Sequence, residues 1–337
     1  MTREIEVADK SRIYVGCADE LLQRLLHAKR VILLTDEHVA ACHAQLIEPY
    51  ESIVIAPGEA SKSLAEVERI YLRLVEMGAD RTTFILGVGG GVVTDIAGFV
   101  ASTYMRGVEF GFVTTSLLGA ADASVGGKNG VNLGGFKNMV GTFSQPRFVV
   151  CDARLLSTLP DREFRAGLAE VIKSAILGDA GLFALLERAS FEALRTDSTL
   201  LEEVLLRTIR IKASVVTQDE REGGLRRTLN LGHTLAHAIE KCTHTVNHGE
   251  AVAVGLHHIT RTSLVQGLIA DGDAERIFAL LRHYGFSTEL PAPHDELCRA
   301  VRGDKKRSGH TIHLILPTAI GAVIDREVEL DNIHDIL

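Results

Sequence analysis

Short apolar runs recur along the first half of the chain, and each is followed by a turn or by a stretch with helical spacing. The runs are Val31–Thr35, Ile53–Ala56, Phe84–Gly89, Phe110–Thr115 and Phe148–Asp152. Continuous apolar strands that alternate with helices are typical of a parallel sheet covered on both faces. The pattern therefore predicts an N-terminal α/β domain built around a parallel sheet.

The pattern changes after Pro160, where apolar residues recur at spacings of three and four. This periodicity predicts a mostly α-helical C-terminal domain. The expected helices are Arg162–Leu177, Asp179–Leu194, Leu200–Thr217, Thr228–Lys241 and Glu250–Gln266. Two strand-like runs flank a turn at Thr318–Gly321, which predicts a terminal β-hairpin. We expect the domains to cover residues 1–158 and 159–337.

Composition and charge narrow the classes of function. The chain has 337 residues, 36 Lys and Arg against 44 Asp and Glu, and a formal net charge of −8. This balance supplies no bulk attraction to nucleic-acid phosphates or anionic lipids. The five cysteines show no CxxC spacing, and no apolar run suits a signal peptide or a membrane span. We therefore expect a cytoplasmic protein that binds neither nucleic acid nor membrane.

Two glycine-rich segments are candidates for binding an anion. Gly87–Gly98 follows a predicted strand and opens a predicted helix, where free backbone amides favour a phosphate. Asp122–Asn138 carries Lys128 and Lys137 on a glycine-rich loop, where lysines can close on a phosphate or carboxylate. A tight turn in the first segment and two solvated lysines in the second would explain the same residues without a ligand.

Histidines and a carboxylate in the second half form a candidate metal site. His233 and His237 lie four residues apart on one helical face, and His248 follows. Glu170 and Lys173 lie three residues apart on another predicted helix. Two histidines and one glutamate from separate segments, with an open coordination position, are typical of catalytic zinc. An exposed ion pair and hydrogen-bonded core histidines are the alternative interpretation.

Cationic and amide side chains precede these histidines. The spacing predicts that Asn230 and His233 share a helical face, with Arg226 one turn earlier and Lys212 upstream. Such a group beside a metal indicates a polyanionic substrate. A further basic run, Asp304–Arg307, belongs either to the same site or to a solvated turn.

The ordered set of motifs resembles the 3-dehydroquinate synthase family over nearly the whole chain. The motifs that carry the resemblance are PGEASKS from Pro57, GVGGGVVTDIAGF from Gly87, TYMRG from Thr103, DASVGGK from Asp122, FKN from Phe136, TLPDREFRAGLAEVIK from Thr158, DEREGGLR from Asp219, LNLGHTLAHAIE from Leu229, HGEAVAVG from His248 and DKK from Asp304.

The resemblance implies a fold, cofactors and a reaction. It implies a Rossmann-like N-terminal domain that binds NAD, and a helical C-terminal domain that binds the substrate and a divalent metal, Zn²⁺ or Co²⁺. The family converts the sugar phosphate 3-deoxy-D-arabino-heptulosonate 7-phosphate to 3-dehydroquinate and phosphate, in the shikimate route to aromatic amino acids. The implied steps are transient oxidation by NAD, loss of phosphate, reduction and intramolecular aldol closure. The resemblance also implies a homodimer.

Carried over motif by motif, the resemblance implies site residues as well. The implied metal ligands are Glu170, His233 and His248. The implied NAD contacts are Asp36, Glu59, Lys62, Gly90, Gly91, Asp95, Thr115, Ser116, Lys128, Lys137 and Thr158. The implied catalytic and substrate-facing residues are Arg106, Asp122, Lys128, Asn138, Lys173, Lys212, Arg226, Asn230, His237 and Lys305 or Lys306.

Some positions depart from the family pattern. Thr114 stands where a proline is common, Leu133 and Gly134 stand where His-Pro is common, and His38 stands where Asn is usual. These departures fall within segments that the resemblance assigns to ligand binding.

Related activities stay open as alternatives. A 2-deoxy-scyllo-inosose or valiolone-type synthase shares the implied fold and cofactors but closes a neutral sugar phosphate. Metal-dependent polyol dehydrogenases share the two-domain plan, and a metal-binding protein without turnover is a further alternative. Arg226 and Lys212 suit a substrate carboxylate and favour the acid substrate.

Overall fold

The computed structural model describes residues 2–134, 136–243, 245–302 and 310–336. The chain divides into two compact units, one of Met1–Phe164 and Ser198–Thr217, the other of Arg165–Asp197 and Gln218–Leu337. The predicted boundary between residues 158 and 159 lies before the one between Phe164 and Arg165. The prediction also placed residues 198–217 in the second domain, whereas they belong to the first compact unit. The functions expected for the two domains stay predictions.

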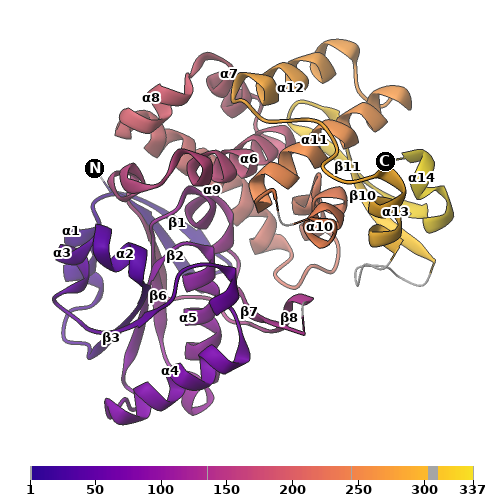
Figure 1. The fold of residues 1–337 in the computed structure, drawn as a ribbon. Coiled ribbons are helices and arrows are strands. Elements are labelled where there is room, and N and C mark those ends of the chain that lie inside the picture. Colours follow the sequence, from indigo (N-terminus) through magenta and orange to yellow (C-terminus); the bar gives the residue numbers. More distant parts are fainter. Residues whose placement is uncertain (1, 135, 244, 303–309, 337) are drawn as a thin grey trace. The chain divides into compact units, whose positions relative to one another are not determined.

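A mixed sheet forms the middle of the first unit (Figure 1). Its strands, in spatial order, are β1 (Arg3–Val7), β2 (Ser11–Val15), β9 (Phe148–Cys151), β6 (Phe110–Thr114), β5 (Phe84–Gly89), β3 (Val31–Asp36) and β4 (Glu51–Ile55). Neighbouring strands pair in parallel from β2 to β4. The predicted parallel sheet is confirmed, and each of the apolar runs forms one of its strands.

The antiparallel β1–β2 hairpin at the edge of the sheet was missed by the sequence analysis. β1 carries Arg3, Glu4 and Glu6, and Val7 is its buried residue. A charged edge strand lacks the continuous apolar run that marks the inner strands, because one side of it faces water. The charged residues of β1 are therefore the reason why the hydrophobic pattern does not predict this strand.

Helices accompany the strands of the first unit. They are α1 (Ala18–Leu25), α2 (Glu37–Cys42), α3 (Ala44–Ile47), α4 (Leu64–Glu76) and α5 (Gly91–Thr103). α5 directly follows β5 and buries Val93, Ile96 and Val100. At Gly98 a Cβ atom would lie 1.9 Å from Oδ1 of Asn129, so glycine permits the close packing of α5 there. This packing fixes the helix whose start is the predicted phosphate-binding turn.

A two-stranded sheet replaces the predicted glycine-rich loop. β7 (Lys128–Leu133) pairs antiparallel with β8 (Phe136–Phe143), and Gly130 is opposite Gly141. A Cβ atom at Gly141 would lie 2.5 Å from the carbonyl oxygen of Asn129. The glycines therefore serve close strand pairing, which composition alone does not distinguish from a flexible loop.

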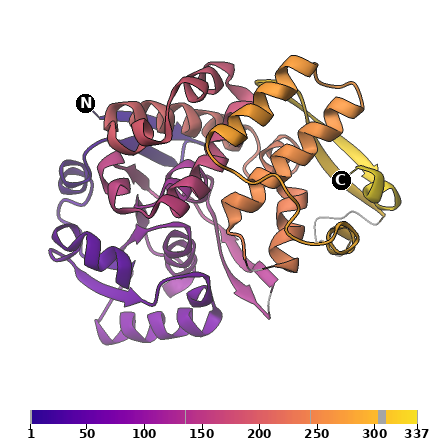
Figure 2. The ribbon, with the colours of Figure 1, turned by 45° about the horizontal axis from the view of Figure 1, so that its top comes forward.

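Helices dominate the second unit (Figure 2). Its elements are most of α6 (Asp161–Gly178), α7 (Ala180–Arg188), α8 (Phe191–Thr196), α10 (His233–Cys242), α11 (His248–Val265), α12 (Asp271–His283), α13 (His294–Arg302), α14 (Ile333–Ile336) and the hairpin of β10 (Thr311–Ala319) and β11 (Ala322–Glu329). α11 packs against α10, α12 and β10. α9 (Ser198–Gln218) belongs, but for its last residue, to the first unit. The predicted helical character and terminal hairpin are confirmed.

Two of the expected helices differ from the observed ones by more than two residues at an end or are interrupted. The one expected at 179–194 is interrupted, because Ser190 caps α8 by accepting a hydrogen bond from the backbone of Ala193 at 3.0 Å. The one expected at 228–241 begins at His233, after Gly232 with φ of 75° and a 3₁₀ helix over Leu225–Asn230. The prediction that Asn230 and His233 share one helical face is therefore wrong.

Candidate active site

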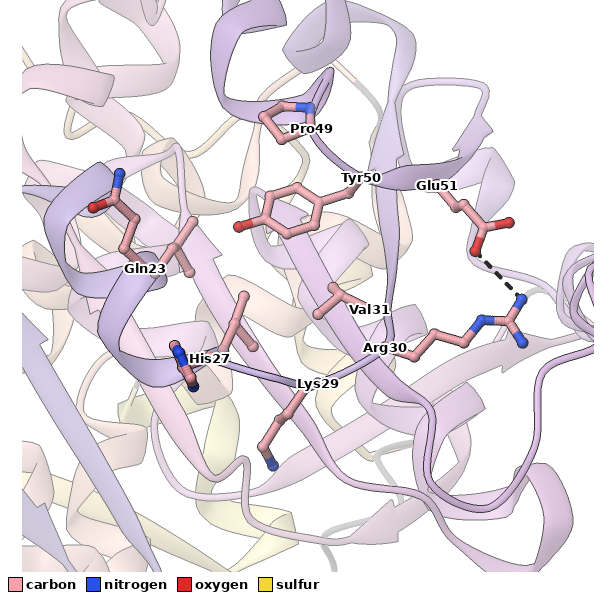
Figure 3. A pocket seen from close by; sticks show the side chains of 10 residues that line it. Gln23, His27, Lys29, Arg30, Val31, Pro49, Tyr50 and Glu51 are labelled. Carbon is pink, nitrogen blue, oxygen red and sulfur yellow. Dashed lines mark hydrogen bonds and ion pairs between the residues drawn. The ribbon is translucent and has the colours of Figure 1, made fainter.

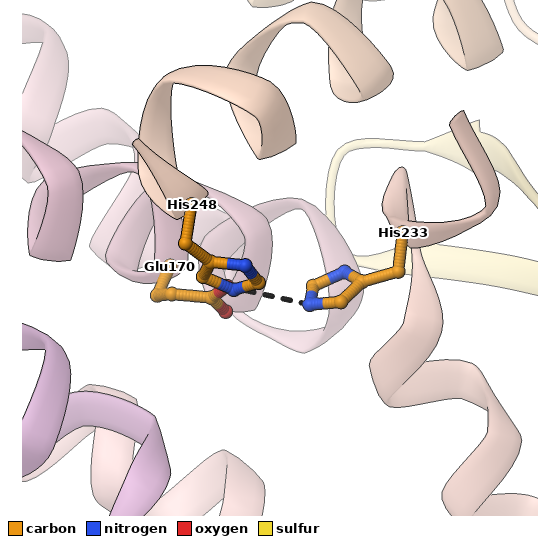
Figure 4. A group of neighbouring side chains, drawn as sticks. All are labelled: Glu170, His233 and His248. Atoms are coloured by element: carbon orange, nitrogen blue, oxygen red, sulfur yellow. Dashed lines mark hydrogen bonds and ion pairs between the residues drawn. The ribbon is translucent and has the colours of Figure 1, made fainter. Parts of the chain in front are cut away.

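Three side chains of metal-ligand type converge in the second unit (Figure 4). Glu170 comes from α6, His233 opens α10 and His248 opens α11. Oε1 of Glu170 lies 3.2 Å from Nε2 of His248 and 3.4 Å from Nε2 of His233. One donor atom of each residue lies within 4.8 Å of the other two. Two imidazole nitrogens and a carboxylate oxygen are a donor set of catalytic zinc sites, so these residues fit a divalent metal.

Backbone packing brings the three helices to one place. Gly232, just before α10, touches Gly255 of α11, where a Cβ atom would lie 2.0 Å from the carbonyl oxygen of Gly232. Gly249 of α11 touches Ala166 of α6, where a Cβ atom would lie 2.1 Å from the carbonyl oxygen of Ala166. Any side chain at Gly249 or Gly255 would push the helices apart. These glycines therefore hold the ligand-bearing elements in contact.

The start of α11 is held by reciprocal capping hydrogen bonds. The side chain of Asn247 accepts from the backbone of Glu250 at 2.9 Å, and the carboxylate of Glu250 accepts from the backbone of Asn247 at 2.8 Å. This capping box satisfies backbone donors at the helix start. It also fixes the backbone at His248, the first residue of the helix.

Glu170 is the charge at the middle of the group. Its side chain is 1% exposed and forms an ion pair with Lys173, one turn along α6. Burial raises the pKa of Glu170, but Lys173 and His233 outweigh burial, and the pKa lies well below its usual range. Glu170 is therefore ionised, as a metal ligand must be. The pair is buried, so the alternative interpretation of an exposed ion pair is wrong.

The two histidines point their Nε2 atoms toward Glu170 because their other ring nitrogens have acceptors. Nδ1 of His233 lies 3.1 Å from the carbonyl oxygen of Leu231. Nδ1 of His248 lies 3.4 Å from Oε1 of Glu240, a carboxylate of α10 whose side chain is 10% exposed. Acceptors of this kind fix the tautomer and orientation of metal-binding imidazoles.

The electrostatic environments of the two imidazoles differ. Burial and the charge of Lys173 lower the pKa of His233. Burial also acts to lower the pKa of His248, but its hydrogen bonds with Glu170 and Glu240 raise that pKa to about 10. Two carboxylates around one imidazole make this a site that attracts positive charge, either a proton or a metal ion.

Of the other predicted residues of the second unit, His237 contacts this group, while Arg226 and Asn230 bond to residues of the preceding turn. The ring of His237 meets the ring of His233 edge to face, with centroids 5.5 Å apart. Arg226 is buried, and its guanidinium donates to the carbonyl oxygen of Glu220. Nδ2 of Asn230 donates to Oε1 of Glu222 at 2.8 Å. Hydrogen bonds with neighbouring residues therefore hold Arg226 and Asn230 in place before α10.

Asp219 organises the turn that carries Arg226. Its carboxylate accepts from the backbone N–H groups of Gly223, Gly224 and Arg226 at 2.9, 2.7 and 2.9 Å. The hydrogen bonds from Arg226, Gly223 and Gly224 lower the pKa of Asp219 to about 2. In the sequence Asp219 stands out only as part of a motif, and the geometry makes it a positioning residue.

The first unit holds the predicted dinucleotide contacts. Gly90 and Gly91 form the start of α5, and a Cβ atom at Gly90 would lie 3.0 Å from Oγ of Ser116. Backbone N–H groups at a helix start favour a phosphate. The hydroxyl of Ser116 accepts from the backbone of Gly119 at 3.0 Å, and the backbone of Thr115 donates to Gly89 at 3.0 Å. The turn is therefore compact and free of side-chain bulk at its glycines.

Buried Lys62 forms an ion pair with half-buried Asp95, the side chains being 6% and 17% exposed. The carbonyl oxygen of Lys62 accepts from the backbone of Asn132 at 2.8 Å, and the carboxylate of Glu59 accepts from Nδ2 of Asn132 at 2.8 Å. The segment at Glu59–Lys62 is thereby tied both to α5 and to the β7–β8 hairpin. Three predicted cofactor contacts, Glu59, Lys62 and Asp95, therefore lie in one network.

The remaining predicted residues of the first unit are more dispersed. Asp36 caps α2 by accepting from Val39 at 2.9 Å, and the hydroxyl of Thr158 lies 3.1 Å from Nε2 of His43. Lys128, Lys137 and Asn138 lie on the β7–β8 hairpin, with φ of 52° at Asn138. Arg106 also has a positive φ, of 71°. Lys305 and Lys306 lie outside the described residues.

Lys212 pairs with Asp122 within the first unit. Its Nζ atom lies 2.8 Å from Oδ1 of Asp122 and 2.6 Å from the carbonyl oxygen of the same residue. Both residues belong to the first unit, and Arg226 belongs to the second. Sequence proximity of Lys212 to Arg226 therefore does not place them in one compact unit.

A pocket of about 360 Å³ lies in the first unit, at the amino ends of β3 and β4 (Figure 3). Arg30 pairs with Glu51 at 3.3 Å, and Lys29 pairs with Glu109 at 2.5 Å. These cations are thus held by carboxylates. None of the predicted site residues lines this pocket, which is lined by Leu22, Gln23, Leu26, His27, Lys29, Arg30, Val31, Pro49, Tyr50 and Glu51.

Solved structures with this fold define the class of the protein. A 2-deoxy-scyllo-inosose synthase complexed with carbaglucose-6-phosphate, NAD⁺ and Co²⁺ is 25% identical, with a TM-score of 0.87 over 100% of this chain and 99% of that one. A 2-epi-5-epi-valiolone synthase from Streptomyces hygroscopicus with NAD⁺ and Zn²⁺ bound is 26% identical, with a TM-score of 0.88 over 99% and 96%. The chain has the fold of the sugar-phosphate cyclases, an α/β unit joined to a helical unit.

Sequence comparison then gives the family. The family model for the 3-dehydroquinate synthase N-terminal domain matches residues 52–166, and the model for the C-terminal domain matches residues 167–307. The 3-dehydroquinate synthase of Desulforamulus reducens is 44% identical over 308 residues, which are 88% of this chain and 86% of that protein. The chain belongs to the 3-dehydroquinate synthase family. Among the described helices, none is long and apolar enough to cross a bilayer.

Proposed function

We propose that this chain converts 3-deoxy-D-arabino-heptulosonate 7-phosphate to 3-dehydroquinate and phosphate, as an NAD- and metal-dependent carbon–oxygen lyase. The observation that carries the proposal is the group of buried Glu170, His233 and Lys173 with half-buried His248, in a chain of this family. A cytoplasmic location and a homodimer belong to the same proposal.

Glu170, His233 and His248 would hold the metal, Zn²⁺ or Co²⁺. Two relatives of similar fold were solved with one of these ions, which supports the assignment. When bound, such an ion supplies Lewis acidity toward substrate oxygens. Glu170 is ionised and His233 favours the neutral form, as ligation needs, whereas His248, with its pKa raised to about 10, would lose a proton as the metal binds.

The glycine turn at Gly90 and Gly91 would hold the pyrophosphate of NAD⁺. The start of α5 offers backbone N–H groups without side chains in the way. When bound, the nicotinamide supplies reversible acceptance of a hydride from the substrate carbon that bears a hydroxyl, while the hydroxyl proton goes to a base. The other proposed contacts are Asp36, Glu59, Lys62, Asp95, Thr115, Ser116, Lys128, Lys137 and Thr158.

Polar side chains of the chain itself would bind the substrate and move its protons. Lys173 is buried against Glu170, and His237 packs on the edge of His233, so both are suited to holding or transferring a proton beside the metal ligands. Cations suit the phosphate and carboxylate of the substrate as charge-assisted donors. The proposed substrate-facing residues are Arg106, Asp122, Lys128, Asn138, Lys212, Arg226, Asn230 and Lys305.

A second candidate function is closure of a neutral sugar phosphate. This candidate is supported by the similarity of the fold to two cyclases of that kind, with TM-scores of 0.87 and 0.88. The acid substrate is preferred because the chain is 44% identical to a 3-dehydroquinate synthase, against 25% and 26% to the two cyclases.

One assay separates these candidates. The purified protein, loaded with Zn²⁺, is given the heptulosonate 7-phosphate with less NAD⁺ than substrate, and released phosphate and NADH absorbance are followed. We expect one phosphate per molecule of product, nearly complete conversion and no lasting NADH. Stoichiometric NADH would indicate a polyol dehydrogenase, and turnover of glucose 6-phosphate in place of the acid would indicate the neutral-sugar reaction.

A further inference from the structure

A second group of metal-ligand side chains lies in the second unit, separate from Glu170. His294 and Asp295 open α13, and His334 lies in α14. Nε2 of His334 is 3.0 Å from Oδ1 of Asp295, and the rings of His294 and His334 meet edge to face with centroids 4.7 Å apart. One donor atom of each of these three residues lies within 4.8 Å of the other two.

Packing of α13 and α14 holds the three side chains close together. Ile333, the residue before His334, is fully buried, so the short α14 is anchored against the unit. α13 is anchored by Leu297 and Cys298, which are 1% and 3% exposed. α13 and α14 contact each other directly. The ligand-type atoms therefore come from two packed elements rather than from one flexible segment.

An ion pair alone explains this group poorly. The side chains of His334 and Asp295 are 54% and 73% exposed, and exposed pairs contribute little to stability. Two neutral imidazoles with one carboxylate instead form the nitrogen and oxygen set that divalent transition metals bind.

We propose that His294, Asp295 and His334 bind a divalent transition-metal ion, in addition to the ion held at Glu170. The ion links α14 to α13 and so fastens the C-terminal end of the described chain. Because Asp295 and His334 are exposed, water completes the coordination, and the site is structural in its effect. The inference does not rest on the proposed function, since none of its residues belongs to that site.

Metal content tests the proposal. The wild-type protein and its variants are loaded with excess Zn²⁺, desalted and analysed by inductively coupled plasma mass spectrometry. We expect two ions per chain in the wild type and one in His334→Ala and in His294→Gln. The matched control, His27→Ala, removes an exposed histidine of the first unit and retains two. The same number of ions per chain in His334→Ala as in the wild type overturns the proposal, whether that number is one or two.

A second measurement separates this site from the one at Glu170. His248→Ala loses a ligand of the first site only, so this variant still binds one ion, and Zn²⁺ still raises its Tm. The double variant of His248→Ala with His334→Ala shows no rise in Tm with Zn²⁺. A rise of equal size in both variants contradicts the proposal. Loss of activity in His248→Ala reports on the proposed function alone.

Discussion

Oε1 of Glu240 lies 3.4 Å from Nδ1 of His248, while Nε2 of the same imidazole lies 3.2 Å from Glu170. The ring is therefore held between two carboxylates from different helices. With Nδ1 facing Glu240, Nε2 is the nitrogen that would bind a metal, and the metal would displace the proton that the two carboxylates favour on this ring. Glu240 orients His248 without being a ligand itself.

Replacing Glu240 by Gln should weaken metal binding. The amide keeps the shape of the side chain but removes the charge that holds the His248 tautomer. Loss of such an outer-shell partner weakens metal affinity by about 10- to 100-fold. Competition with a coloured chelator measures the dissociation constant. Glu275→Gln, an exposed position of α12, is the matched control, and equal affinity in wild type and Glu240→Gln would remove this role.

Chelation should abolish activity, and Zn²⁺ or Co²⁺ should restore it. Glu170, His233 and His248 form a donor set for a divalent ion. Without the ion, these side chains cannot supply its positive charge. His248→Ala should not recover activity on addition of stoichiometric metal. Full turnover by the metal-free wild type would contradict the assignment of a catalytic metal.

Changing Arg226 to Ala should lower kcat/KM for the acid substrate. A charge-assisted hydrogen bond is worth about 1.5–3 kcal/mol, which corresponds to a loss of roughly ten- to a hundredfold. Arg226→Lys should recover part of the loss, because the charge returns without the planar fork of donors. Arg227→Ala, which removes the neighbouring pair with Asp325, is the control. An unchanged kcat/KM would reopen the neutral-sugar alternative.

A branched side chain at Gly90 should weaken NAD⁺ binding while leaving the metal content unchanged. A Cβ atom at this position already meets Oγ of Ser116 at 3.0 Å, so the two methyl groups of Val would crowd the turn. Titration calorimetry with NAD⁺ measures the effect. Gly272→Ala serves as the control, because no heavy atom lies within 4 Å of a Cβ there. Wild-type NAD⁺ affinity in Gly90→Val would place the cofactor elsewhere.

Asp219→Asn should destabilise the second unit near neutral pH and lose its effect in acid. Backbone hydrogen bonds lower the pKa of Asp219 to about 2 in the folded protein, against about 3.9 for an unfolded Asp. A depressed pKa means that the stabilisation is present above the unfolded value and is lost as the pH falls through the folded value. Urea midpoints of both proteins should therefore converge between about pH 4 and 2. A constant difference between the two urea midpoints across this range would mean that the carboxylate charge does not contribute to stability. Asp331→Asn, at an exposed position, is the control.

Local pattern was sufficient for much of the fold. The continuous apolar runs at Val31, Phe84 and Phe148 predicted inner strands because a run without polar alternation has to be buried on both faces. The edge strand at Arg3–Val7 was not predicted, because its exposed side carries charged residues and such a segment has the composition of a loop. The β7–β8 hairpin escaped because its glycines serve close pairing.

The sequence by itself determined which residue types are available for the site. It placed His233 and His237 four apart on α10, and Glu170 and Lys173 three apart on α6, because helical periodicity puts such pairs on one face. The family motifs then singled out His248. These inferences depend only on short separations and on order along the chain.

Only the tertiary structure decided which of these groups meet. Glu170 and His248 are 78 residues apart in sequence, and their contact depends on the packing of glycines between helices. The same structure assigned Glu250 to a helix cap and Glu240 to the far side of His248. It also separated Asn230 from the helical face of His233 by a left-handed Gly232. Spacing along the chain cannot encode these outcomes, because each depends on a backbone approach between segments that are distant in sequence or on one dihedral angle.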